Sequence, residues 1–195
     1  MATQGERRAQ TRRALLDAAA VLFAERGVDG ASIDAIAAAA DRTSGAIYDH
    51  FGGKEGLLFA LLEGWVDDVA AVIGAELTTA TSLDAQLAAV WRNVSDPVTG
   101  DGRWIALEHE LWTYAARNPH ARAHLSARYE AAWAGIESAE WVGGEAGGPG
   151  TGPALIGLLL GLEMMRRVSP DAVPDELAVA ALRGVVTAST KEVHL

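Results

Sequence analysis

Apolar side chains recur every three or four positions along most of this 195-residue chain, the spacing that places them on one face of an α-helix. Near the start, Leu15, Ala19 and Leu22 form such a stripe, and Gly27 follows at a position where helices commonly end. Runs rich in Val, Ile, Thr and aromatic residues, which are typical of strands, are missing. The pattern therefore predicts an all-α protein with a sizeable core, since 50% of the residues are hydrophobic.

Caps, glycines and prolines divide the chain into nine predicted helices. Ser32 is a typical N-cap residue, Gly52-Gly53 forces a break, and Pro119 stands where a proline opens a helix. Glycine is so frequent between residues 142 and 152 that we expect a mobile loop there. The predicted helices span about 8–26, 33–40, 44–50, 54–77, 82–95, 103–117, 119–140 and 153–168, and the ninth begins at 174.

Residues 32–57 carry the most informative pattern, two short helices joined by a tight polar turn, then a glycine break and a third helix. This is the layout of a helix-turn-helix, whose second helix enters the major groove of DNA while the first crosses the backbone. Ile36, Ala37 and Ile47 are small or apolar and face a common core, which leaves the polar side chains of the second helix exposed. Hydroxyls, exposed amides and an aromatic hydroxyl there suit contacts to phosphates and base edges.

The stretch from Ser32 to Leu57, which contains Thr-Ser-Gly-Ala-Ile-Tyr-Asp-His-Phe-Gly-Gly-Lys, closely resembles the DNA-binding signature of the TetR family of bacterial one-component regulators. The resemblance is strongest over residues 11–63 and rests on the number and order of helices elsewhere. It implies an all-α fold with a three-helix DNA-binding domain at 1–53 and a six-helix effector-binding and dimerisation domain at 54–195.

By the same resemblance, Tyr48, His50 and Lys54 contact phosphates, and Lys54 adds a cation beside a helix N-terminus, which itself attracts phosphate. The first residues of the second helix of the motif lie nearest to base edges, while Ser32 and Thr43 cap helices and also reach phosphates. The expected DNA-binding residues are Ser32, Arg42, Thr43, Ser44, Gly45, Ala46, Tyr48, His50 and Lys54.

Three residues depart from the family pattern. Asp41 replaces the usual turn glycine, and aspartate tolerates the left-handed backbone that this turn needs better than most residues. Arg42, which follows it, reaches a phosphate or pairs with Asp41 or Asp34. Asp49 places a negative charge on the recognition helix, where it repels phosphate unless it faces sideways or accepts a hydrogen bond from cytosine. These residues leave the operator sequence open.

The net charge of −10 argues against general nucleic-acid binding, because neutralising phosphates requires Lys and Arg. Residues 1–56, however, carry seven basic and eight acidic residues, a net charge of −1, whereas residues 57–195 carry nine and eighteen, a net charge of −9. Most of the acidic residues therefore lie outside the N-terminal part of the chain, which is the part that would contact DNA. Four arginines crowd the first thirteen positions and are equally compatible with a solvated, frayed end: Arg7, Arg8, Arg12 and Arg13.

The last two predicted helices are too apolar for the surface of a monomer. Gly157 and Gly161, four residues apart, would let another helix approach closely. In the TetR family these helices pair with those of a second copy in a four-helix bundle, and reading two half-sites needs such two-fold symmetry. An intramolecular core alone is the other interpretation. The expected homodimer interface contains Leu155, Leu158, Leu159, Leu162, Met165, Leu177, Ala181, Leu182 and Val185.

Six tryptophans lie between these regions. Trp104, Glu108 and Trp112 are spaced by four, Tyr129 and Trp133 form a similar face, and an apolar pocket with few polar groups is the usual form of a small-molecule site. A carboxylate inside such a pocket favours a cationic or hydrogen-bonding effector. Aromatic stripes are also typical of ordinary cores. The expected pocket residues are Trp65, Trp91, Trp104, Glu108, Trp112, Tyr129 and Trp133, and the sequence does not specify the effector.

Little in the sequence supports an enzyme. The chain has no cysteine, which excludes thiolate metal sites and suits a reducing cytoplasm, and it lacks Gly-x-Ser-x-Gly and His-Glu-x-x-His motifs. His120 and His124 are four residues apart, yet we expect no metal, cofactor or catalytic residue. The longest apolar run, 153–162, is about half of the ~20 residues that cross a membrane, and the start does not look like a signal peptide. We expect a cytoplasmic protein without a membrane partner.

The sequence therefore predicts a homodimeric TetR-type regulator, most simply a repressor that leaves a palindromic operator in double-stranded DNA when a small molecule binds. Two other hypotheses remain. One is a dimeric helical interaction protein whose DNA reader has degenerated, which Asp41, Asp49 and the acidic charge would explain. The other is a small-molecule enzyme in the C-terminal part. The residues do not distinguish a repressor from an activator, and they do not specify the target genes.

Overall fold

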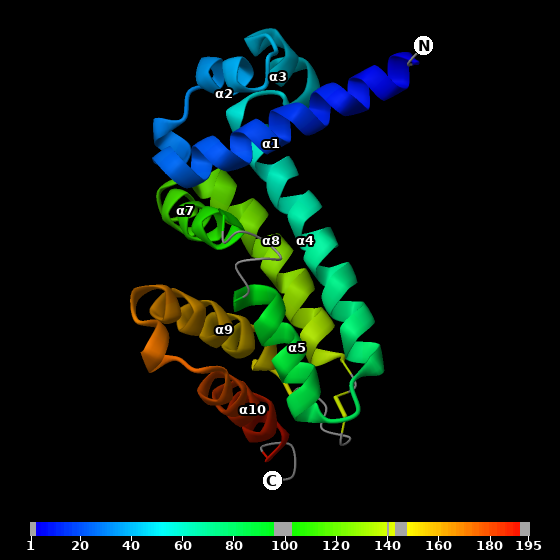
Figure 1. Cartoon of the computed structure of the whole chain (residues 1–195), viewed down its shortest axis with the longest axis vertical. Coiled ribbons are helices and arrows are strands. Elements are labelled where there is room, and N and C mark those ends of the chain that lie inside the picture. The colour runs from blue at the N-terminus through cyan, green and yellow to red at the C-terminus, as the bar shows by residue number, and fades with distance from the viewer. Residues whose placement is uncertain (1–2, 96–102, 140, 143–147, 192–195) are drawn as a thin grey trace. The chain divides into compact units, whose positions relative to one another are not determined.

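The computed structural model describes residues 3–95, 103–139, 141–142 and 148–191. Over these ranges the chain is all-α, with nine α-helices, one short 3-10 helix and no strand, which confirms the predicted fold class (Figure 1). The elements are α1 (Gln4–Gly30), α2 (Ile33–Ala39), α3 (Ser44–Phe51), α4 (Lys54–Thr79), α5 (Leu83–Ser95), α7 (Arg103–Arg117), α8 (Pro119–Glu137), α9 (Thr151–Val168), η1 (Pro170–Ala172) and α10 (Asp175–Lys191).

The first helix begins earlier than predicted. Thr3 and Glu6 form a capping box in which the Thr3 hydroxyl accepts from the Glu6 N–H and the Glu6 carboxylate accepts from the Thr3 N–H. The N-terminal arginines therefore stand on a capped helix and not on a frayed end. At the other end Gly27 has a φ of 72°, which confirms the predicted break, although helical structure continues as far as Gly30.

The stretch 142–152, predicted as a loop, falls partly outside the described residues, which omit 143–147. Thr151 and Gly152 already belong to α9 and are buried. None of the helices that the structure describes combines the length and the apolar character needed to cross a bilayer.

The chain packs into two compact units. The first contains Met1–Asp68 and Gly100–His124, and the second contains Val69–Thr99 and Leu125–Leu195. Both α4 and α8 therefore run from one unit into the other. The first unit includes α7, which the sequence prediction grouped with the effector domain, so the contacts divide the chain differently from the expected boundary after residue 53. That boundary concerns function and stays a prediction.

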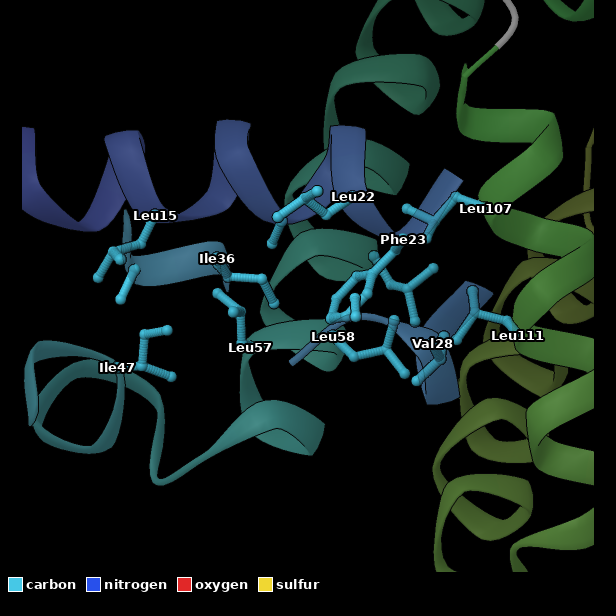
Figure 2. Packing of buried hydrophobic residues seen from close by; sticks show 14 residues of the cluster. Leu15, Leu22, Phe23, Val28, Ile36, Ile47, Leu57, Leu58, Leu107 and Leu111 are labelled. Atoms are coloured by element: carbon cyan, nitrogen blue, oxygen red, sulfur yellow. The ribbon is translucent and has the colours of Figure 1, made fainter. Parts of the chain in front are cut away.

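The core of the first unit forms where α1, α2, α3 and the start of α4 meet (Figure 2). Leu15, Ile36, Ile47 and Leu57 come from these four helices in turn, and each is fully buried. Burying a side chain of this size stabilises a fold by roughly 1.5–3 kcal/mol relative to leaving it exposed. The predicted core positions Ile36, Ala37 and Ile47 are confirmed, and they fix α3 by its apolar face, which leaves its polar face outside.

The helix α7 is anchored on α1. Leu107 and Leu111 are buried and extend the core of the first unit (Figure 2). At Gly27 a Cβ would lie 2.8 Å from Glu110 Oε2, closer than real contacts allow. Glycine is therefore favoured at this position for its positive φ, whereas the Glu110 carboxylate is the end of a flexible side chain that could turn aside.

In the second unit, α5 packs against α9 and α10. Trp91 of α5 is buried, and its indole Nε1 donates to Asp175 Oδ1 at 2.8 Å. The Arg166 guanidinium pairs with the same carboxylate and lies 5.5 Å from the centroid of the Trp91 ring. A single tryptophan thus fastens α5 to both of the last two long helices, a packing role that the sequence did not predict.

Replacing Asp175 by asparagine should make the free energy of unfolding less sensitive to a fall in pH. The hydrogen bonds from Arg166 and then from Trp91 hold the pKa of Asp175 below its ordinary value of 3.8. A carboxyl with a lower pKa in the folded state adds stability above its unfolded pKa, and this stability is lost as the pH falls through the folded pKa. The effect is modest, because this carboxylate is largely exposed. Urea unfolding from pH 7 down to about pH 2 should show a larger loss of unfolding free energy in the wild type than in Asp175→Asn, and identical profiles would contradict this role.

Candidate nucleic-acid interface

The helix-turn-helix is built from local interactions. Ser32 caps α2 as predicted, since its side chain accepts from the Ala35 N–H at 3.1 Å. Asp41 has a φ of 52°, which confirms the left-handed turn position expected for it. Aspartate adopts this conformation at a smaller cost than most residues, so the missing glycine leaves the turn intact.

Arg42 stays close to its neighbour in the chain. Its guanidinium donates to the backbone oxygen of Asp41 at 2.6 Å and lies 4.0 Å from the Asp41 carboxylate. Asp34, the other partner considered, instead accepts from the Ser44 hydroxyl at 2.5 Å, which ties the start of α3 to α2. The structure therefore shows Arg42 paired with Asp41, and its contact to phosphate stays a prediction.

The exposed face of α3 carries the groups expected to meet DNA. Thr43 occupies the N-cap position, but its side chain makes no capping hydrogen bond, which corrects the predicted capping role and leaves an exposed hydroxyl. Gly45 is exposed and Ala46 is half-buried beside it. Tyr48 is 57% exposed, whereas its neighbour Ile47 is fully buried. This helix thus presents a hydroxyl and an aromatic ring at the surface while its other face holds it in the core.

His50 lies half-buried near the end of α3. Burial, followed by the nearby guanidiniums of Arg8 and Arg12, lowers the pKa of His50 below 6.5, and Asp49 opposes this only in part. The lowered pKa therefore favours the neutral imidazole at pH 7 in the free protein. A neutral imidazole offers one N–H donor and one acceptor, so its predicted phosphate contact would be a hydrogen bond and not an ion pair.

Lys54 has a structural role that sequence reasoning missed. Its Nζ donates to the backbone oxygens of Val28, at 2.8 Å, and Ala31, at 3.3 Å. These carbonyls belong to the end of α1, where helix carbonyls lack intrahelical partners and favour a cation. Two of the three ammonium protons are thereby used within the chain. The phosphate contact of Lys54 stays a prediction, and replacing this lysine would test stability as much as DNA binding.

The residues predicted to line an effector pocket are divided between the two units. Glu108 and Trp112 belong to the first unit, where Glu108 is buried and Trp112 is 36% exposed. Tyr129 and Trp133 belong to the second unit, and their rings stack with 5.8 Å between centroids. Trp91, also in the second unit, has the packing role described above. The pocket stays a prediction.

Some polar atoms buried in the second unit have no hydrogen-bond partner among the described residues. They include the indole nitrogen of Trp141 and the hydroxyl of Thr151, and both side chains are more than nine-tenths buried. Leaving such a group unpaired costs about 1–3 kcal/mol, so a partner for it would be stabilising. The side chains of Trp65 and Trp104, the remaining predicted pocket residues, lie outside the described part of the structure.

His120 and His124 contact separate glutamates of α4. His120 Nδ1 lies 3.0 Å from Glu55 Oε2, and His124 Nε2 lies 3.6 Å from Glu63 Oε1. The Phe59 ring stacks on His124 with 3.9 Å between centroids and lies 5.8 Å from the ring of His120. The two histidines thus fasten the start of α8 to α4.

The apolar residues of α9 and α10 divide into two sets. Leu155, Leu159 and Leu182 are buried inside the second unit, where they pack within the chain, and their place in a dimer interface stays a prediction. Val168, which the sequence analysis missed, is 82% exposed and lies three residues beyond Met165 on the same helix. The predicted interface residues that are exposed or half-buried are Leu158, Leu162, Met165, Leu177, Ala181 and Val185.

The family model of the bacterial regulatory proteins called the tetR family matches residues 15–61. This range contains the shared core of α1 to α4, the left-handed turn at Asp41 and the exposed Tyr48. The chain carries a TetR-family DNA-binding domain. The first turns of α1 lie ahead of the matched range.

Curated relatives agree with this assignment. The HTH-type transcriptional repressor KstR2 of Rhodococcus jostii is 47% identical over 55 residues, which are 28% of this chain and 27% of KstR2. The HTH-type transcriptional repressor AcnR of Corynebacterium efficiens is 30% identical over 120 residues, which are 61% of this chain and 58% of AcnR. The chain thus spans about a quarter of the length of KstR2.

Solved structures match most of the chain. SCO7518 from Streptomyces coelicolor A3(2) superposes with a TM-score of 0.71 at 28% identity, over 91% of this chain and 99% of that protein. A protein from Saccharomonospora viridis solved in complex with choline has a TM-score of 0.72 at 21% identity, over 92% and 96% of the two chains, and shows the fold alone. The helical part beyond the TetR-type domain therefore also has a known architecture.

Proposed function

We propose that this protein is a transcriptional repressor that binds operator DNA as a homodimer and releases it when a small molecule binds. The observation that carries the proposal is the TetR-type reader, whose α3 is fixed by Ile47 and exposes Tyr48 and the Thr43 hydroxyl. Exposed hydroxyls and rings at the start and on one face of a recognition helix suit phosphates and base edges. The similarity of parts of the chain to two repressors supports this role.

Dimerisation would occur through the exposed apolar face of α9 and α10. Met165 and Leu177, 60% and 48% exposed, are too apolar to be left in water without reason. Gly157 and Gly161 lie on α9 with no described atom within 4 Å of a Cβ added to either, so a second helix could approach closely. A two-fold pair of readers is what two operator half-sites require.

An effector would act through the second unit. The Trp141 indole and the Thr151 hydroxyl, which have no hydrogen-bond partner among the described residues, favour a small molecule with hydrogen-bonding groups. The choline complex of the structural neighbour makes a cationic ligand one class worth testing. A ligand that prefers a dimer with altered spacing of the recognition helices would lower DNA affinity by its differential affinity for that state. The continuous helix α4, which runs through both units, would carry the change.

The two other hypotheses receive less support. Asp41 fits its left-handed turn, so its replacement of glycine does not indicate a degenerate reader. The matched curated relatives named above are regulators and not enzymes. Since a repressor acts on the chromosome, we place the protein in the bacterial cytoplasm.

Fluorescence anisotropy with genomic DNA fragments selected by the protein itself would test the proposal. Selected duplexes should bind at least about 1,000-fold more tightly than scrambled duplexes at physiological salt. Tyr48→Phe removes one exposed hydroxyl and should lower affinity by roughly 3- to 10-fold while leaving urea unfolding unchanged, because a hydrogen bond is worth about 1 kcal/mol. Weak binding that is equal on both DNAs would refute the repressor role and favour an interaction protein.

A further inference from the structure

One face of α1 carries basic residues near the N-terminus of the helix and apolar residues farther along, where the helix enters the core of the first unit. Arg8, Arg12, Leu15 and Ala19 follow the helical period, so the two arginines extend the same stripe as the two apolar residues. Leu15 and Ala19 are fully buried, whereas Arg8 and Arg12 are exposed. The apolar part of the stripe is therefore buried in the core of the first unit, and the two arginines at its N-terminal end are exposed.

This basic end of α1 lies beside the end of the recognition helix. The guanidinium carbon of Arg12 is 4.9 Å from the ring centroid of Phe51, the last residue of α3. Such a contact orients the planar guanidinium and leaves its N–H donors able to bind an anion. Burial, and after it the charges of Arg8 and Arg12, lower the pKa of His50, the preceding residue, as nearby guanidiniums do.

Both arginines keep their charge available. Within the described ranges neither forms an ion pair, whereas Arg42 and Arg117, elsewhere in the first unit, each pair with an aspartate. The capping box at Thr3 holds the helical turns that carry them. In the part of the chain that the structure describes, they are exposed cations without an acidic partner beside α3.

The rest of the reader supplies little positive charge. Arg42 is paired with Asp41, Lys54 donates to the carbonyls of Val28 and Ala31 at the end of α1, and the lowered pKa of His50 favours its neutral form. Asp49 adds an exposed negative charge to α3 itself. Because binding to duplex DNA depends on cations that displace counterions from phosphates, the charge has to come from another element.

We propose that Arg8 and Arg12 form a second DNA contact, in which α1 binds backbone phosphates beside the bases that α3 reads. The inference rests on the proposed function, since it presumes that α3 docks in the major groove. Guanidinium groups match phosphate oxygens with paired N–H donors. Contacts of this kind set affinity and register and carry no sequence information. They lie ahead of the range that the family model matches, so they would be an addition to the shared reader.

A salt series with the double variant Arg8→Gln/Arg12→Gln tests this contact. Anisotropy is recorded on the duplex that the wild type selects from genomic fragments and on its scrambled form. The slope of log affinity against log salt should become shallower by about 0.9 for each phosphate that the variant no longer neutralises, so by up to about 3.6 in a dimer. Affinity for both duplexes should fall together by at least about tenfold, leaving the ratio between them unchanged.

Three variants make the outcome specific. Arg26→Gln removes an exposed arginine from the other end of the same helix and should leave the slope as it is. Arg8→Lys/Arg12→Lys keeps both charges and should retain most of the slope. If the double glutamine variant does not fold, Arg8→Gln alone carries the test, because Arg12 is the arginine that contacts Phe51.

The outcomes separate this inference from the proposed function. A wild-type protein that selects its operator, together with an Arg8→Gln/Arg12→Gln variant of unchanged slope and affinity, would overturn the α1 contact and leave the repressor role standing. An equal loss in Arg26→Gln would also overturn it, because the effect would then be one of overall charge. A wild-type protein without any sequence preference would remove the proposed function and this contact with it.

Discussion

Replacing Gly161 by arginine should convert the protein from a dimer to a monomer at micromolar concentration and lower its affinity for operator DNA at least about 100-fold. A Cβ at Gly161 would meet no described atom of the chain within 4 Å, and the residue is exposed. The arginine therefore has room in a single chain, and glycine is in any case a poor helix residue. A second copy packed on α9 has no such room. Losing one of two linked readers removes the gain in affinity that bivalent binding gives, which is typically about 100- to 10,000-fold.

Sedimentation equilibrium and anisotropy on the selected duplex would measure the two effects. Gly135→Arg is the matched control, since Gly135 is also an exposed helical glycine with no described atom within 4 Å of an added Cβ, but it lies on α8. This control should remain a dimer and bind DNA like the wild type. If the Gly161→Arg protein stayed dimeric, the interface would lie elsewhere. The exposed apolar residues of α9 would then have no assigned role.

Replacing Gly56 by alanine should lower the free energy of unfolding by about 1–3 kcal/mol, as overpacking does, although alanine is the better helix former. Gly56 stands in the first turn of α4, and a Cβ there would lie 1.9 Å from the backbone oxygen of Phe51, the last residue of α3. Backbone cannot rotate away as a side chain can, so α3 and α4 have to separate. Because this turn sets the position of the recognition helix, DNA affinity should fall as well.

The sign of the stability change makes Gly56→Ala informative. Gly64 lies on the same helix with no described atom within 4 Å of an added Cβ, so Gly64→Ala should raise the free energy of unfolding by up to about 1 kcal/mol. Urea denaturation of both variants would show shifts in opposite directions. If Gly56→Ala stabilised the protein as Gly64→Ala does, the close approach of the two helices would not be a constraint in solution.

Local sequence patterns were enough to predict most of the helices and the class of the DNA-binding motif. Helix bounds follow from caps, glycines and the apolar period, which are properties of neighbouring residues, so the Ser32 cap and the Gly52-Gly53 break were predictable. The left-handed backbone at Asp41 was predictable for the same reason, because it depends on how one side chain tolerates a turn. Ile36 and Ile47 were predictable core residues, since the motif fixes which faces of two short helices meet.

Only the tertiary structure decided how chemically similar residues divide their roles. The helix α9 is apolar on much of its circumference, and the period alone does not say which leucines face the chain itself, so Leu159 is buried while Leu158 is half-exposed. The sequence presents Lys54 as a free cation. In the folded chain its Nζ donates to the carbonyls of Val28 and Ala31, which are distant in sequence. Contacts between residues far apart in the chain depend on the closed fold, and no local pattern records them.

The same reason explains why the packing of α7 and the role of Trp91 were not predicted. Leu107 packs in the core of the first unit, and Trp91 donates a hydrogen bond to Asp175. These roles were not predictable because the partners of each residue come from a distant part of the chain. The arginines at the start of α1 were visible in the sequence as charge alone. The proposal that they contact DNA rests on the Phe51 ring beside Arg12, which only the packing of α1 against α3 provides.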